Sequence, residues 1–128
     1  MTSTSLGHVL VVDDEDDIRS MLAIVLAAEG WQVDDAAGGE DAIAKCETTR
    51  HDVVVLDLRM PGMSGLDVAR TLIDREYPAQ LVLFSAYVDS AVERECEELG
   101  VAVVDKVDWY GLVDACRIYA PARARVDA

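Results

Sequence analysis

Four short apolar segments of the chain each end in polar residues, and those polar residues differ in chemical kind from one segment to the next. The segments are residues 9–12, 53–56, 81–84 and 101–104. Wholly apolar runs of this length, bounded by polar residues, are typical of strands buried on both faces, as in a parallel sheet covered by helices. A weaker strand is predicted from Trp31 to Asp35.

Apolar residues at helical spacing predict a helix after each strand. Gly30 is expected to cap the end of the first helix, and Gly100 to close the fourth. The third helix should end before Pro78, because proline disfavours helical geometry in the residue before it. The expected helices are residues 16–29, a short helix around 42–46, and residues 66–73, 88–99 and 108–120.

Strict alternation of strands and helices predicts an α/β fold with right-handed crossovers and a parallel sheet. A chain of 128 residues has room for one such domain. Its residues are 52% hydrophobic but only 5% aromatic, which favours a core of Val, Leu, Ile and Ala. We expect residues 8–120 to form the domain, between an N-terminal segment of residues 1–7 and a short C-terminal tail of residues 121–128.

The polar residues after the strands should lie together, because ligands bind at the carboxyl ends of parallel strands. Three carboxylates within a few ångströms repel one another, and a hard cation such as Mg²⁺ relieves that repulsion. The residues expected at this edge are Asp13, Asp14, Asp57, Ser85, Asp105 and Lys106.

This set of residues resembles, in type and order, the receiver domain of two-component response regulators. Residues 57–65 look like that family's phosphoacceptor loop and read Asp-Leu-Arg-Met-Pro-Gly-Met-Ser-Gly. The resemblance extends from about His8 to Tyr119, and the single-domain receivers of the chemotaxis-regulator type are the nearest in kind. It implies a flavodoxin-like (βα)5 fold, a doubly wound five-stranded parallel sheet with strand order 2-1-3-4-5.

The resemblance makes Asp57 the phosphoacceptor. Lys106 and Ser85 would contact the phosphoryl oxygens, and the small Ala86 would leave room for the group. The alternative for Lys106 is an ordinary surface lysine paired with Asp105 or Asp108.

The same resemblance implies how Mg²⁺ would be bound. Asp14, Asp57 and the backbone carbonyl of Arg59 are expected to bind the ion directly, and Asp13 through a water molecule. The alternative is that residues 13–17 form a solvated acidic turn that caps a helix.

Two positions depart from the family pattern. Val103 stands where the family usually has the aromatic ring that reports phosphorylation, so a change of shape must rely on Ser85, on loop movement or on another ring such as Tyr87. Val107 follows Lys106 where proline is common. A cis peptide without proline costs about 3–4 kcal/mol, so we expect a trans bond or stored strain there.

Arg59 and Tyr87 occupy the two positions that tend to set the lifetime of the phosphoryl group in this family. Both side chains are large enough to shield the phosphorus from water. This predicts slow self-dephosphorylation.

Composition excludes several classes of function. The net charge of −14 argues against direct nucleic-acid binding by this chain. No apolar stretch approaches the roughly 20 residues of a membrane span and no secretory signal is seen, so we expect a cytoplasmic protein without membrane insertion. Cys46, Cys96 and Cys116 are widely spaced and expected to be buried and reduced.

The expected function is that of a stand-alone receiver. It would take a phosphoryl group from a histidine kinase or phosphotransfer protein and then bind an unidentified output protein differently, or relay the group. By resemblance, the fourth helix, fifth strand and fifth helix would form the interaction face and a possible homodimer surface. Trp109 and Tyr110 would be either exposed anchors there or ordinary core.

Two alternatives stay open. A degenerate receiver would bind partners without phosphorylation. A Mg²⁺-dependent aspartyl-phosphate hydrolase is disfavoured, because Asp57 is followed by Leu58 and Arg59 and lacks the second carboxylate two positions on. We therefore expect no enzymatic activity beyond self-phosphorylation from small donors and self-dephosphorylation.

Overall fold

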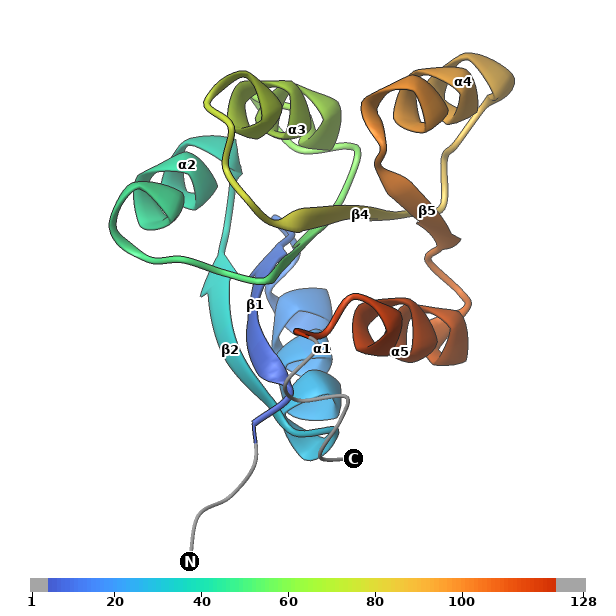
Figure 1. The fold of residues 1–128 in the computed structure, drawn as a ribbon. Coiled ribbons are helices and arrows are strands. Elements are labelled where there is room, and N and C mark those ends of the chain that lie inside the picture. The colour runs from blue at the N-terminus through green and yellow to red at the C-terminus, as the bar shows by residue number, and fades with distance from the viewer. Residues whose placement is uncertain (1–4, 122–128) are drawn as a thin grey trace, which may run out of the picture.

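The computed structural model describes residues 5–121 of the chain, in which five strands alternate with five helices (Figure 1). In chain order they are β1 (Gly7–Val12), α1 (Asp16–Ala28), β2 (Trp31–Ala36), α2 (Gly39–Thr48), β3 (Val53–Leu56), α3 (Gly65–Asp74), β4 (Gln80–Ser85), α4 (Ser90–Leu99), β5 (Ala102–Asp105) and α5 (Trp109–Ile118).

All the strand pairs are parallel, and the strand order is β2-β1-β3-β4-β5. Helices α1 and α5 cover one face of the sheet, while α2, α3 and α4 cover the other (Figure 1). The predicted doubly wound α/β fold and its strand order are thus confirmed.

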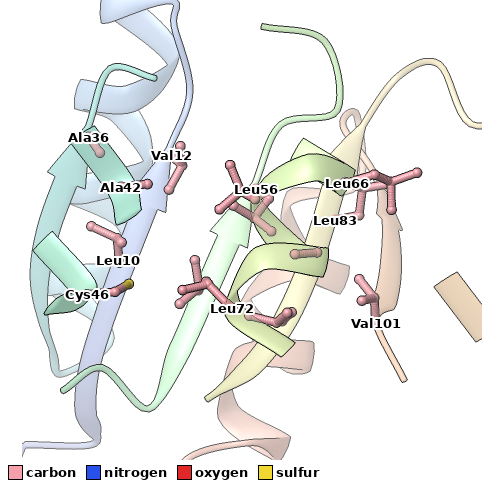
Figure 2. Close-up of a cluster of buried hydrophobic side chains, with 14 of the residues drawn as sticks. Leu10, Val12, Ala36, Ala42, Cys46, Leu56, Leu66, Leu72, Leu83 and Val101 are labelled. Carbon is pink, nitrogen blue, oxygen red and sulfur yellow. The ribbon is translucent and has the colours of Figure 1, made fainter. Parts of the chain in front are cut away.

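The core consists of one cluster of apolar side chains on each face of the sheet. Successive residues of a strand point to opposite faces, so Leu10 joins the cluster under α2 and α3, whereas Val9 and Val11 join the cluster under α1 and α5. Figure 2 shows the first cluster, in which Ala42 and Cys46 of α2 belong with Leu10. Burial on both faces explains why β1, β3 and β4 are continuous apolar runs.

The last of the four apolar runs, residues 101–104, is not buried on both faces, contrary to the sequence prediction. In β5 half-buried residues alternate with exposed ones, and Val103 is 38% exposed. The physical reason is that β5 is an edge strand, and α4 beside it buries only one residue of its own, Cys96. Apolar composition alone therefore did not distinguish this edge strand from the central ones.

The helix ends lie close to the predicted ones. Glu29 is the C-cap of α1, and Gly30 follows it with a φ of +108°. Gly100 caps α4 in the left-handed conformation, as expected. Val88, the expected first residue of the fourth helix, instead lies two residues before α4 begins, although it packs against the core cluster that contains Leu10. The side chain of Asp108 caps α5.

The fold extends slightly beyond the expected start of the domain. β1 begins at Gly7, and buried Leu6 donates its backbone N–H to the carbonyl of Gly30 at 2.9 Å. Most of the expected tail, residues 122–128, lies outside the described residues. The three cysteines are free and buried, as predicted. Within residues 5–121, no helix has the length and apolar character needed to cross a bilayer.

Candidate functional site

Three carboxylates converge at the carboxyl edge of the sheet. Asp13 and Asp14 follow β1, and Asp57 follows β3, the neighbouring strand. One oxygen of each lies within 4.8 Å of the others. Asp13 and Asp57 are buried, whereas Asp14 is exposed, so the cluster opens to solvent on the side of Asp14.

The ammonium group of Lys106 lies inside this cluster. Its Nζ is 3.0 Å from Asp13 Oδ2 and 3.5 Å from Asp57 Oδ2, and Glu15 Oε1 is 3.9 Å away. Burial acts to lower the pKa of Lys106, but the facing carboxylates outweigh it and the pKa is raised, which keeps the ammonium charged. Lys106 thus contacts the carboxylate cluster, whereas the alternative interpretation paired it with Asp105 or Asp108 at the surface.

The carboxylates proposed as alternative partners of Lys106 have other roles. Asp105 Oδ1 accepts the backbone N–H of Val107 at 3.0 Å, and Asp108 Oδ1 accepts that of Gly111 at 2.8 Å. Both therefore stabilise the turn that leads from β5 into α5.

Asp57 is unusually easy to protonate in the metal-free site. Burial, together with the neighbouring charge of Asp13, raises its pKa to about 6, although Lys106 opposes the shift. The raised pKa shows that the carboxylate of Asp57 is costly to charge in this buried position beside Asp13. Such a set of carboxylate oxygens is a suitable donor set for a hard divalent cation.

The acidic turn after β1 fixes Asp13 and does not cap α1 through a side chain. Asp13 Oδ1 accepts the N–H of Glu15 at 2.9 Å, while the N-cap residue Glu15 makes no side-chain capping bond. The contact between Glu15 and Lys106 was not anticipated from the sequence, because it depends on how this turn meets β5 in space.

The loop between β3 and α3 has almost no free space beside Asp57. The N–H of Gly65 donates to the carbonyl of Leu58 at 2.9 Å, and a Cβ at Gly65 would lie 2.2 Å from the carbonyl oxygen of Asp57. Ser64 and Asp67 then form a capping box that begins α3. Gly65 therefore allows the close approach that holds the loop against the end of β3.

Ser85 lies at the end of β4 and is 2% exposed. Its Oγ accepts the N–H of Tyr87 at 3.2 Å, and its carbonyl accepts the N–H of Lys106, also at 3.2 Å. Ser85 thus fixes the start of the loop that carries Ala86 and Tyr87, and it ties this loop to the backbone of Lys106.

Arg59 and Tyr87 contact each other across the mouth of the site. The guanidinium carbon of Arg59 lies 4.4 Å from the centroid of the Tyr87 ring, a distance suited to a cation–π interaction. The sequence indicated two large side chains near Asp57 but not that they pair. The pair links the loop after β3 to the loop after β4.

Val103 and Val107 are the two positions that depart from the family pattern, and the structure shows the surroundings of the first and the peptide geometry before the second. Val103 lines a hollow of about 510 Å³ between α4 and β5, together with Ser85 and Val88. The Lys106–Val107 peptide is trans, since no cis peptide occurs among the described residues. Of the two outcomes foreseen for this bond, the trans geometry is the one found.

Trp109 and Tyr110 have different environments. The Trp109 ring packs edge to face on Phe84 with a centroid distance of 5.8 Å; it is half-buried and packs against the cluster under α1 and α5. Tyr110 is 88% exposed. Trp109 is therefore engaged in packing against the core, whereas Tyr110 is available as a surface anchor.

The chain matches the family model described as the response regulator receiver domain over residues 9–106. It is 44% identical over 86 residues to the probable transcriptional regulatory protein TcrX of Mycobacterium tuberculosis, which covers 67% of this chain and 36% of the relative. It is 30% identical over 118 residues to sporulation initiation phosphotransferase F of Bacillus subtilis, which covers 91% of this chain and 95% of the relative.

Solved structures give a consistent comparison. The response regulator protein TrrA of Thermotoga maritima, determined in complex with Mg²⁺-BeF, aligns with a TM-score of 0.79 and 33% identity, covering 88% of this chain and 97% of that one. The chain spans only 20% to 36% of the length of the first four curated relatives it matches.

Proposed function

This chain belongs to the response regulator receiver family, and from that premise we propose that Asp57 accepts a phosphoryl group from a histidine kinase or phosphotransfer protein. The modified chain would then bind an output protein with a different affinity or pass the group on. The observation that carries the proposal is the position of Lys106 Nζ beside both Asp13 and Asp57 at the end of the sheet.

The proposed transfer is a displacement at phosphorus. One carboxylate oxygen of Asp57 forms a bond to phosphorus while the bond from phosphorus to the donor's imidazole nitrogen breaks, and its electron pair stays on the nitrogen. Lys106 would stabilise charge on one phosphoryl oxygen, and the Ser85 hydroxyl would donate to another. Ala86, which is small and exposed, leaves space beside the group.

The carboxylate cluster fits Mg²⁺ by its oxygen donors, and burial together with the charge of Asp13 raises the pKa of Asp57, which a bound cation would counteract. Asp14 and Asp57 would bind the ion with the carbonyl of Arg59, and Asp13 would act through water. The bound ion supplies positive charge to the phosphoryl oxygens. The Mg²⁺-BeF complex of the Thermotoga maritima relative supports this part of the proposal.

The partner surface is proposed to be the face made by α4, β5 and α5. Tyr110 and Val107 are its most exposed large side chains, at 88% and 82%. Trp109 is excluded as an anchor by its packing against Phe84.

The two rival functions differ in what they require of the site. A hydrolase of the aspartyl-phosphate type needs a carboxylate two residues after the nucleophile, but that residue is Arg59, which pairs with Tyr87. A degenerate receiver needs none of the cluster, whereas Asp13, Asp14, Asp57 and Lys106 are all in contact range.

Intact mass spectrometry after incubation with acetyl phosphate tests the proposal. We expect one added phosphoryl group with Mg²⁺ and none with a chelator, because the uncompensated carboxylates repel the donor's phosphate. Circular dichroism under both conditions checks that the chain stays folded. No addition to a folded chain in Mg²⁺ would favour the degenerate binding module.

The Arg59 and Tyr87 pair gives a prediction about the lifetime of the phosphoryl group. An exposed cation–π contact is worth about 0.5–1 kcal/mol, and we expect this contact to hold the two side chains over the phosphoryl group. Without it, water should reach the phosphorus more often, so Arg59→Ala and Tyr87→Ala should each speed hydrolysis about 2- to 5-fold. Loss of phosphoryl mass with time measures the rate. Tyr87→Phe keeps the ring and should match the parent chain; unchanged rates in both alanine variants would remove the shielding hypothesis.

A further inference from the structure

A second cluster of ligand-type side chains lies near the amino ends of the strands. It consists of His8 near the start of β1, Asp34 in β2 and His51, two residues before β3. Asp34 Oδ2 lies 3.0 Å from His8 Nε2 and 2.9 Å from His51 Nε2. The two imidazole rings lie edge to face, with centroids 4.7 Å apart. The Nε2 atom of each ring therefore faces the same carboxylate oxygen of Asp34.

This cluster is separate from the phosphoacceptor site. His8 precedes Asp13 by five residues of extended chain, about 16 Å at roughly 3.3 Å per residue. His8 shares a face of β1 with Leu10, whose register partner in β2 is Asp34. Leu10 belongs to the core cluster that includes Ala42 and Cys46 of α2, so these ligands lie on the face that α2 covers.

His51 is held in place by contacts on both sides of its ring. Tyr77 Oη accepts the backbone N–H of His51 at 2.7 Å and lies 3.0 Å from His51 Nδ1. On the other side of the ring, His51 Nε2 lies 2.9 Å from the carboxylate of Asp34. When the proton of the neutral ring is on Nδ1, Nε2 presents its lone pair beside that carboxylate, as metal binding requires.

The three side chains place their ligand atoms close together, since one nitrogen of each imidazole and one carboxylate oxygen all lie within 4.8 Å of one another. His51 is fully buried, whereas His8 and Asp34 are partly exposed. A cation bound between them would neutralise the carboxylate of Asp34 and use the nitrogen lone pairs of both imidazoles.

We propose that His8 Nε2, His51 Nε2 and the carboxylate of Asp34 form a binding site for a divalent transition-metal ion of the Zn²⁺ class. Two imidazoles and a carboxylate, with a water molecule as the fourth ligand, form a common donor set for zinc. Tyr77 Oη lies 3.0 Å from His51 Nδ1 and would accept its N–H when Nε2 binds the ion, the kind of outer contact that orients a metal-binding histidine.

The geometry needs only a small adjustment to take the ion. Metal–ligand bonds of about 2.0–2.1 Å at tetrahedral angles place ligand atoms about 3.3 Å apart. The contacts to Asp34 Oδ2 are a few tenths of an ångström shorter than that. The side chains of His8 and Asp34 are 25% and 39% exposed, so they have room to move and give the ion access, while His51 stays fixed.

The consequence of binding would be a link between β1, β2 and the segment that enters β3. An ion that binds only the folded chain stabilises it by mass action. Imidazole nitrogen favours zinc over magnesium, whereas the acidic cluster at the other end offers only oxygen. The two sites should therefore load independently.

Isothermal titration with Zn²⁺ in excess Mg²⁺ tests the proposal, using the full chain with Asp14→Asn to weaken the acidic cluster. We expect one ion per chain. His8→Gln and Asp34→Asn should each weaken binding at least tenfold, and Tyr77→Phe about 10- to 100-fold by removing the outer contact. His8 and Asp34 are the chosen positions because they are partly exposed, whereas replacing buried His51 risks the fold.

The titration has outcomes that overturn the proposal. The proposal is wrong if the chain does not bind Zn²⁺ in excess Mg²⁺. It is also wrong if His8→Gln binds Zn²⁺ with the same affinity as the parent. Thermal unfolding of each metal-free variant is recorded alongside. A variant that unfolds near the parent temperature without metal, yet loses the upward shift on adding Zn²⁺, supports the site.

Discussion

Replacing Asp57 with asparagine is expected to abolish phosphoryl incorporation from acetyl phosphate and, in the same protein, to increase the metal-free stability at neutral pH. The first effect follows because the amide is not a nucleophile toward phosphorus. The second follows because Asp57 is buried beside Asp13, so the charged carboxylate lowers the free energy of unfolding. Intact mass and urea unfolding measure the two effects.

The stability effect should depend on pH in a defined way. A carboxyl with a pKa raised from 3.8 to about 6 binds its proton more tightly in the folded chain, so its contribution to stability falls as the pH rises between those values. The full cost of the charge is about 3 kcal/mol and is present above the folded pKa. Asp57→Asn should therefore gain up to about 3 kcal/mol over the parent at pH 8 in a chelator, and much less at pH 4.5.

Two results would contradict this account of Asp57. Phosphoryl addition that survives Asp57→Asn would mean that another residue is the acceptor. A stability difference that is constant from pH 4.5 to pH 8 would mean that the carboxylate of Asp57 is not costly to charge in the folded chain. Because the comparison is between two chains at each pH, titration of the other carboxylates largely cancels.

Gly65→Ala is expected to destabilise the chain by about 3 kcal/mol, the upper part of the usual range for overpacking. The new Cβ would lie 2.2 Å from the carbonyl oxygen of Asp57 and 2.9 Å from its carbonyl carbon, and both are backbone atoms at the end of a buried strand. The clash must displace either the start of α3 or Asp57 itself. Phosphoryl incorporation should therefore fall as well.

Gly38→Ala is the matched control for this effect. Gly38 also stands at the start of a helix, its φ is −168°, and no atom lies within 4 Å of the position of its Cβ. The substitution should cost no more than about 1 kcal/mol, from weaker capping by alanine. Urea unfolding measures the loss of stability in both variants. Equal losses would show that the loop after Asp57 can shift to make room for the new Cβ.

The sequence predicted the fold, and the convergence of polar residues at one edge of the sheet, well because both depend on local pattern. Apolar runs mark strands, and the polar residue after each run lies at one edge whatever the details of packing. Thus Asp13, Asp57 and Lys106 were expected together, and they lie together in the structure. The roles of these residues in phosphoryl transfer remain predictions.

The parts that sequence reasoning missed depend on distances across the sheet. Nothing local distinguishes β5 as an exposed edge, since its residues are as apolar as those of β4. The His8, Asp34 and His51 cluster requires the register of β1 on β2 and the conformation of the segment before β3. Likewise, the contact between Arg59 and Tyr87 joins two loops that no spacing rule brings together.

The position of Lys106 affects how the carboxylate cluster would bind Mg²⁺. Its ammonium group already sits among the carboxylates as a permanent internal counter-ion, 3.0 Å from Asp13. If the cluster binds Mg²⁺ as proposed, the ion and the ammonium group would compete for the same carboxylate oxygens. Part of the binding energy of the ion would then be used to displace Lys106, which would lower the affinity for Mg²⁺. The displaced ammonium group would be free to contact the phosphate of the donor.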